Sequence, residues 1–384
     1  MERITVLNSD RLAWCLRDRG VGVAECAQEL AISASSLQEV LAGEDSFTPN
    51  QLRKIADYFG RSVLFFVDPE PFNEAKLHSA QFRTLANQKS NLSPAIKALI
   101  ERVERQRDVY LSLREDLDAQ DQNQFLPPKF IGKSPANAAA LARTWLGLGN
   151  KNDFESYRKA VEAKGILIFR SNGYAEKWKV PKESTVLGFS LYHAECPVIF
   201  IKKQRAGAPE SFTLFHELAH LLLHRASVID DEDSMHADSG SEQEANAFAG
   251  LVLVPDHFLN QICDASRPTE VANFDEWLSA PRNAWGVSAE VILRRLLDSN
   301  RLPRAQYLAY RSWRSNLLPA ADEQSSGGMR WRDREPIHIF GDGYVRTVLD
   351  ALNASQISLV KASDHLDGLK ISYLHKLEAF YADA

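Results

Sequence analysis

The segment His216-Glu217-Leu218-Ala219-His220 combines the residue types and the spacing of a metal-dependent hydrolytic site. Histidines four positions apart lie on one face of an α-helix, so both imidazoles can bind one cation. Glu217 lies beside them and can remove a proton from a metal-bound water. The flanking residues are mostly apolar, which predicts a buried helix, and buried histidines and acids need a partner. The alternative interpretation is a helix with two half-exposed histidines that bind nothing.

Two histidines alone do not make a catalytic zinc site, which usually has a third protein ligand and one open coordination position. His224 lies another four residues along the chain. The helical rise separates it from His216 by ~12 Å, so these two side chains cannot share an ion. We therefore expect His224 near the last carbonyls of the helix, where a histidine is favourable.

The segment 241–248 offers the missing ligand. Ser241 and Glu244 fit a capping box, which assigns Glu244 to the helix backbone. Glu242 and Asn246 share another face, so Glu242 can bind the metal while Asn246 hydrogen-bonds a ligating imidazole and selects its tautomer. The alternative for Glu242 is a solvated acid that interacts with the helix dipole. With a water in the fourth position, the predicted metal ligands are His216, His220 and Glu242.

Periodicity and capping residues predict the elements that must position these side chains. Two helical segments, 211–223 and 242–252, carry the candidate ligands, with a polar loop at 230–240 and a solvated His236 between them. Two amphipathic helices and three strands come before them, and the strands cover 165–170, 185–191 and 198–202. This order predicts an α+β domain with a small, mostly antiparallel sheet packed on helices.

The 384 residues are enough for several domains. Pro127-Pro128 and Ser325-Ser326-Gly327-Gly328 indicate connecting segments. We expect the C-terminal region to dock on the rest of the chain or to mediate oligomerisation. The predicted regions are an all-helical domain at 1–70, a helical linker at 71–133, the domain with the candidate metal site at 134–320 and a small helical domain at 335–384.

Composition excludes several classes of protein. Hydrophobic residues make up 45% and charged residues 25%, as in a globular chain rather than a disordered one. The formal net charge is −6, so no general basic field indicates nucleic acid or an anionic membrane. The four cysteines form no C-x-x-C pair, which argues against a disulfide scaffold. Without a signal-peptide pattern or a long apolar run, we expect a cytoplasmic protein that does not bind membranes.

The stretch 211–224, followed by Glu242-x-x-Ala245-Asn246-x-Phe248-Ala249 and Val254-Pro255, resembles the ImmA/IrrE-type zinc metallopeptidases. The likeness covers roughly residues 134–300. It implies a zincin-like catalytic core in which Zn2+, with Mn2+ as a second candidate, binds the three predicted ligands, and in which Glu217 is the catalytic base. It also implies an intracellular hydrolase whose targets are helix-turn-helix repressors that are cut or released to induce genes.

Residues 1–67 resemble the Cro/phage-repressor (XRE) type of helix-turn-helix domain, on features that include Ile32-Ser33 and Gly43. Charge argues against DNA binding, because residues 1–70 contain seven Lys and Arg against eleven Asp and Glu, a net charge of −4. The domain could equally bind a protein partner or form a homo-oligomer. If it does bind DNA, the resemblance implies that the contacting residues are Ser33, Ser35, Ser36 and Gln38.

Together these features predict a zinc-dependent endopeptidase of narrow specificity. Its substrate would be a repressor or antitoxin-like protein, in a gene-regulatory, stress or phage/toxin–antitoxin context. We expect the substrate to lie extended along an edge strand, either 185–191 or 198–202. The alternatives are a DNA-binding transcription regulator whose peptidase fold is a sensor or interaction module, and an antitoxin that neutralises its partner by binding alone.

Overall fold

The structure is a computed structural model in which the chain divides into two compact units, Met1–Arg102 and Val103–Ala384. The predicted boundaries at 133 and at 320–335 fall inside the second unit. The described residues are 4, 7–19, 21–44, 47–59, 61–70, 85, 92–130, 132–150, 152–172, 176–181, 183–231, 234, 240–317 and 332–382.

The first unit is helical in its described part. Its core includes Trp14, Leu37, Ile55 and Phe66, which are almost fully buried. Ala31 ends α2 with a φ of 52°, a left-handed conformation that favours glycine, and only three residues join α2 to α3. The helices are α1 (Ser9–Arg19), α2 (Val23–Leu30), α3 (Ala34–Leu41), α4 (Pro49–Phe59) and α5 (Val63–Val67); α7 (Pro94–Asp116) begins here and continues into the second unit.

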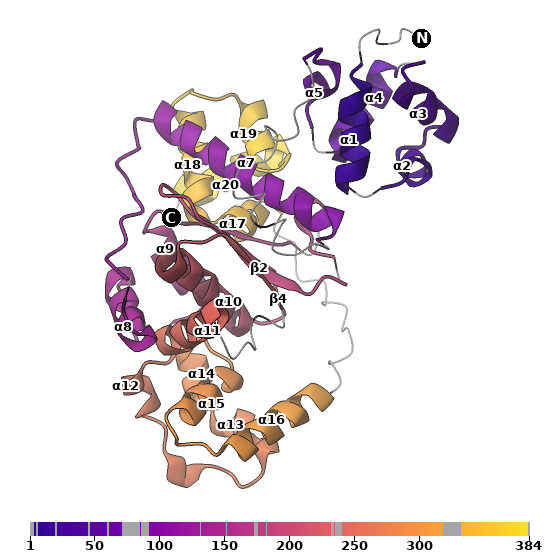
Figure 1. The fold of residues 1–384 in the computed structure, drawn as a ribbon. Coiled ribbons are helices and arrows are strands. Elements are labelled where there is room, and N and C mark those ends of the chain that lie inside the picture. Colours follow the sequence, from indigo (N-terminus) through magenta and orange to yellow (C-terminus); the bar gives the residue numbers. More distant parts are fainter. Residues whose placement is uncertain are drawn as a thin grey trace. The chain divides into compact units, whose positions relative to one another are not determined.

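The second unit is built on a four-stranded sheet of order β1-β3-β2-β4. β1 and β3 are parallel and the other two pairs are antiparallel, as a mostly antiparallel α+β fold requires. Helices cover both faces, with α9 (Phe154–Glu162) and α10 (Gly207–Ala219) on one and α17 (Glu335–Phe340) and α18 (Asp342–Asn353) on the other (Figure 1). The strands are β1 (Leu167–Arg170), β2 (Val186–Leu191), β3 (Val198–Ile201) and β4 (Val228–Asp231).

β4 corrects two expectations. The sequence predicts a polar loop at 230–240, but residues Val228–Asp231 pair with β2, and Asp230 is fully buried. β2 lies between β3 and β4, and β3 lies between β1 and β2, so neither is an edge strand. A substrate therefore cannot add to 185–191 or 198–202, because their backbone hydrogen-bonding groups already have partners on both sides. In the described sheet the edge strands are β1 and β4.

The other helices surround this core. α11 (Gly240–Leu253) packs against both α10 and α8 (Pro135–Leu146) (Figure 1). None of the helices in the described ranges is long and apolar enough to cross a membrane. The remaining elements are α12 (Asp256–Leu259), α13 (Phe274–Trp277), α14 (Ser279–Trp285), α15 (Ala289–Asp298), α16 (Arg304–Asn316), α19 (Leu359–His365), α20 (Ile371–Ala382) and the short turns Glu176–Trp178, Asp264–Ser266 and Val271–Asn273.

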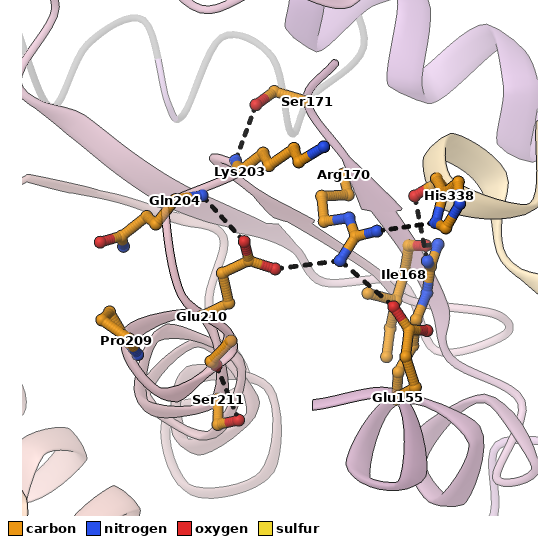
Figure 2. A network of polar contacts seen from close by, with 12 residues as sticks. Glu155, Ile168, Arg170, Ser171, Lys203, Gln204, Pro209, Glu210, Ser211 and His338 are labelled. Carbon is orange, nitrogen blue, oxygen red and sulfur yellow. Dashed lines mark hydrogen bonds and ion pairs between the residues drawn. The ribbon is translucent and has the colours of Figure 1, made fainter. Parts of the chain in front are cut away.

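A buried polar network fixes the N-terminal end of α10 (Figure 2). Arg170, the last residue of β1, donates to Glu210 in the first turn of α10 at 3.1 Å and to Glu155 in α9 at 3.2 Å. Its other amino group lies 3.1 Å from Nδ1 of His338 in α17. Glu210 also accepts a hydrogen bond from the backbone N–H of Gln204. One guanidinium thus connects the sheet to helices on both of its faces.

We predict that Arg170→Met destabilises the protein by about 3–5 kcal/mol, because it leaves the buried carboxylate of Glu210 without its cation. Urea unfolding would measure the loss. A double variant with Glu210→Leu should recover most of it, since no buried charge remains. The control Arg346→Met removes an exposed ion pair with Asp342 and should cost less than about 1 kcal/mol. Equal stability of Arg170→Met and wild type would show that Arg170 does not compensate the buried carboxylate of Glu210.

Candidate metal centre

Three elements bring four potential ligands to one point. α10 supplies His216, and His220 begins the single π-helical turn His220–His224 that continues it. The Nε2 atoms of the two histidines lie 3.1 Å apart. Oε2 of Glu242, from the first turn of α11, lies 3.2 Å from the Nε2 of His216 and 3.5 Å from that of His220. The structure therefore brings together all three residues predicted as ligands.

Asp230 is the fourth member of the cluster, and the sequence analysis did not predict it as a ligand. Its Oδ2 lies 3.3 Å from Nε2 of His216 and 3.4 Å from Nε2 of His220. The four donor atoms all lie within 4.8 Å of one another. Asp230 thus stands in the corner where the sequence predicts a water. It begins the acidic run 230–233, which has the pattern of a solvated loop, and only its pairing with β2 reveals that it is buried.

The cluster fits a small divalent cation. Around Zn2+, with bonds to nitrogen and oxygen of about 2.0–2.2 Å, tetrahedral ligands lie about 3.3–3.5 Å apart. The contacts that involve an imidazole are 3.1–3.5 Å long here, and all four donor atoms lie within 4.8 Å of one another. Imidazole and carboxylate are also zinc ligands by chemistry. Both oxygens of Asp230 are buried and accept no hydrogen bond within the described residues, so the fold leaves this carboxylate for a cation.

Electrostatic coupling within the cluster is strong. Burial alone would lower the pKa of His216, but the adjacent carboxylates of Asp230 and Glu242 raise the pKa to about 9. Burial would raise the pKa values of the two acids, yet the imidazoles hold both below their usual range. Without a metal, protons on the imidazoles therefore balance the carboxylates, and a cation must displace them.

Glu217, the predicted base, is also fully buried. It lies against Gly188 of β2, where an added Cβ would come within 2.6 Å of the glutamate Oε1, so only glycine leaves room for it. Burial, and then the negative charge of Asp230, raise the pKa of Glu217 well above its usual value. A carboxylate in these surroundings holds a proton more strongly than one in water, which suits a group that accepts a proton and then gives it up.

A contact outside the cluster orients His216. Nδ1 of His216 lies 2.9 Å from Oδ1 of Asn246, so Nδ1–H can donate to the amide and leave Nε2 facing the cluster. Asn246 in turn donates to the carbonyl of Ser234. The predicted role of Asn246 thus has the necessary geometry.

His224 is the last residue of the helical segment, as expected, and it also contacts a predicted ligand, whereas Glu244 does not have its expected partner. Nδ1 of His224 lies 3.0 Å from Nδ1 of His220, because the π-helical turn places the two rings side by side. Its Nε2 lies 3.2 Å from Glu244. Glu244 therefore contacts a histidine instead of closing a capping box with Ser241, and α11 begins one residue before that serine.

A cavity of about 820 Å³ adjoins the candidate centre. Thr213 of α10 and Asn246 of α11 line it on the side of the metal ligands. Tyr307, Tyr310 and Arg314 of α16 line it from another element. A cleft with apolar, aromatic and charged walls next to a metal centre is a natural place for a peptide substrate.

The residues predicted to bind DNA lie at the N-cap and in the first five residues of α3. Oγ of Ser33 caps the helix by accepting from the backbone N–H of Ser36 at 3.1 Å. Ser35 and Gln38 are exposed, as a role in binding requires. No finding tests a nucleic-acid role for these residues, which stays a prediction. His236 lies outside the described residues.

Residues 161–297 match the model of a peptidase family, Peptidase_M78, described as the IrrE N-terminal-like domain. The matched region contains all four strands, Glu217 and every member of the metal cluster. It supports the resemblance to ImmA/IrrE-type proteins and a place in a metallopeptidase family, and it does not reach residues 1–67. No curated protein and no solved structure matches the chain.

We predict that Asn246→Ala weakens Zn2+ binding by about 10–100-fold, because His216 loses the partner that orients its ring. Competition with a chromophoric chelator would measure the affinity. Gln243→Ala is the matched control, since Gln243 is an exposed residue of the same helix. Wild-type affinity in Asn246→Ala would show that the amide does not position the ligand.

The affinity for Zn2+ should depend on pH. Because the pKa of His216 is about 9 in the metal-free protein, the imidazole carries a proton at pH 7 that the cation must displace. We expect proton release on binding, and up to about tenfold weaker apparent affinity per pH unit, for each displaced proton, as the pH falls. Calorimetry in two buffers of different ionisation enthalpy measures this release. Binding at pH 7 without proton release would refute the protonated state.

Proposed function

We propose that the protein is a zinc-dependent endopeptidase of narrow specificity. One observation carries the proposal: His216, His220 and Glu242 meet at one point beside the buried Glu217, inside the region that matches a peptidase family. Two histidines and a third protein ligand form the donor set of a hydrolytic zinc centre, and an adjacent acid serves as its base. His216, His220 and Glu242 would hold the ion, with Mn2+ as an alternative to Zn2+.

The chain itself supplies the proton transfers. When bound, the metal supplies Lewis-acid chemistry that polarises the scissile carbonyl and lowers the pKa of a water. Glu217 accepts the proton of the attacking water and passes it to the leaving amine. Asn246 keeps the ring of His216 in the tautomer that presents Nε2. Gly188 leaves the space in which the carboxylate of Glu217 lies.

The substrate of such a centre is an extended segment of a protein. β4 is an edge strand of the described sheet and carries a residue of the metal cluster, so we propose that a peptide adds along its outer edge by backbone hydrogen bonds. The cavity beside Thr213 and Asn246 would receive its side chains. A loop or unfolded segment can take this conformation, whereas a packed helix cannot. We propose a repressor or antitoxin-like protein as the substrate class.

Residues 1–70 serve, in this proposal, to recognise a protein partner. Their net charge of −4 opposes binding to a phosphate backbone. Exposed Glu39 and Glu44 at and after the end of α3 add to that repulsion. The alternative, a DNA-binding regulator with the peptidase fold as a sensor, is less well supported for the same reason.

The decisive variant is Glu217→Gln. We expect cleavage of a co-expressed repressor or antitoxin-like partner to fall by at least about 100-fold, because the amide cannot accept the proton. Metal content should stay at one ion per chain, since the three ligands remain. Intact-mass spectrometry of the partner and elemental analysis of the purified protein give the two measurements.

Glu276→Gln is a suitable control, because it makes the same chemical change at an exposed position of α13. It should cleave like the wild type. If Glu217→Gln cleaves as fast as the control, Glu217 is not the base and the mechanism is wrong. If no partner is cut even by the wild type, a protein that acts by binding alone becomes the better interpretation.

A further inference from the structure

We propose that Asp230 is a fourth protein ligand that closes the metal centre, and that it must leave before peptide hydrolysis can begin. The inference concerns the regulation of the proposed peptidase and therefore rests on that function. A catalytic zinc site keeps one position open for water or substrate, whereas a site with four protein ligands has a structural or resting character.

Asp230 lies as close to the two imidazoles as the predicted ligand Glu242 does. Oδ2 of Asp230 is 3.3 and 3.4 Å from the two histidine Nε2 atoms, and Oε2 of Glu242 is 3.2 and 3.5 Å from them. Each carboxylate thus faces both imidazoles nearly equally, as two corners of one tetrahedron do. The arrangement leaves no vacant corner for water.

Burial supports the same conclusion. The side chains of His216, His220, Glu217 and Asp230 have no exposed surface, and Glu242 has 24%. In this conformation solvent and substrate reach neither the predicted base nor the corner that Asp230 occupies. A working peptidase needs access to both, so the structure shows a form that has to open.

The groups that face Asp230 in the described chain as possible counter-charges are the two imidazoles. Neither of its buried oxygens has a hydrogen-bond partner there, and its ion-pair contacts in the described residues are with the two imidazoles. Leaving a carboxylate buried in this way is costly unless a cation compensates it. Glu217 is buried beside the cluster and Glu242 belongs to it, so three acids gather where a divalent ion would compensate their charge.

β4 can release Asp230 at moderate cost. The strand has four residues, and Asp230 lies opposite Gly188 of β2, next to a register irregularity. It is an edge strand of the described sheet and β2 is its ladder partner there, so fewer ladder hydrogen bonds hold it than hold a central strand. Asp231 provides a matched comparison: successive side chains of a strand face opposite sides, and Asp231 accepts a hydrogen bond from the backbone N–H of Ser234.

The test uses the full-length protein loaded with Co2+, whose visible absorption reports its coordination, and azide as a small ligand for a vacant position. We expect azide to bind at least about tenfold more weakly to the wild type than to Asp230→Ala, because affinity falls with the fraction of protein that is open. Asp231→Ala should match the wild type. Asp230→Ala should also cleave the partner protein faster, if it retains the metal.

Azide binding of equal strength to the wild type and Asp230→Ala would overturn the proposal and leave the peptidase assignment intact. The opposite failure is also distinguishable: an azide difference without any peptide cleavage would support Asp230 as a ligand and refute the peptidase. If Asp230→Ala does not fold or loses Co2+, Asp230→Asn replaces it, since the amide keeps the size of the side chain and is a weaker ligand. If the wild type binds azide as tightly as Asp230→Asn does, Asp230 does not close the metal centre and the proposal is wrong.

Discussion

The mutual neutralisation of buried imidazoles and carboxylates is the interaction on which the second unit depends. His216 and His220 share one buried volume with Asp230 and Glu217, and Glu242 closes it from α11. Burying each of these carboxylates costs free energy, and together they require protons or a cation to compensate their charge. The architecture around them can be understood as the means of holding this set of charges in place.

Each supporting element has a defined part in that task. β2 contributes Gly188, whose missing side chain makes room for Glu217. The Arg170–Glu210 pair holds the first turn of α10 against the sheet and ties it to α9 and α17. α11 places Asn246 against the first histidine. A hydrolytic centre needs such rigid support, because a small displacement of a ligand or of the base lowers the catalytic rate strongly.

In the functions proposed above, β4 connects the chemistry of the centre with its regulation. It is an edge strand of the described sheet, where we propose that a peptide adds, and it carries Asp230, the proposed fourth ligand. If substrate docking and metal opening involve the same four residues, access to the metal is coupled to recognition of the partner. Narrow specificity would then arise from the requirement to move β4 as well as from contacts in the cleft.

The sequence alone determined the local part of this site. The four-residue spacing in His216–His220 and the shared face of Glu242 and Asn246 follow from helical periodicity, which is a property of neighbouring residues. Three of the strands and the α+β class follow from similar short-range patterns. Only the tertiary structure decided the rest. Asp230 has the sequence surroundings of a solvated loop, and only its pairing with β2 places it at the centre. The approach of α11 brings Glu242 and Asn246 to the same point. These contacts join segments that no local pattern relates.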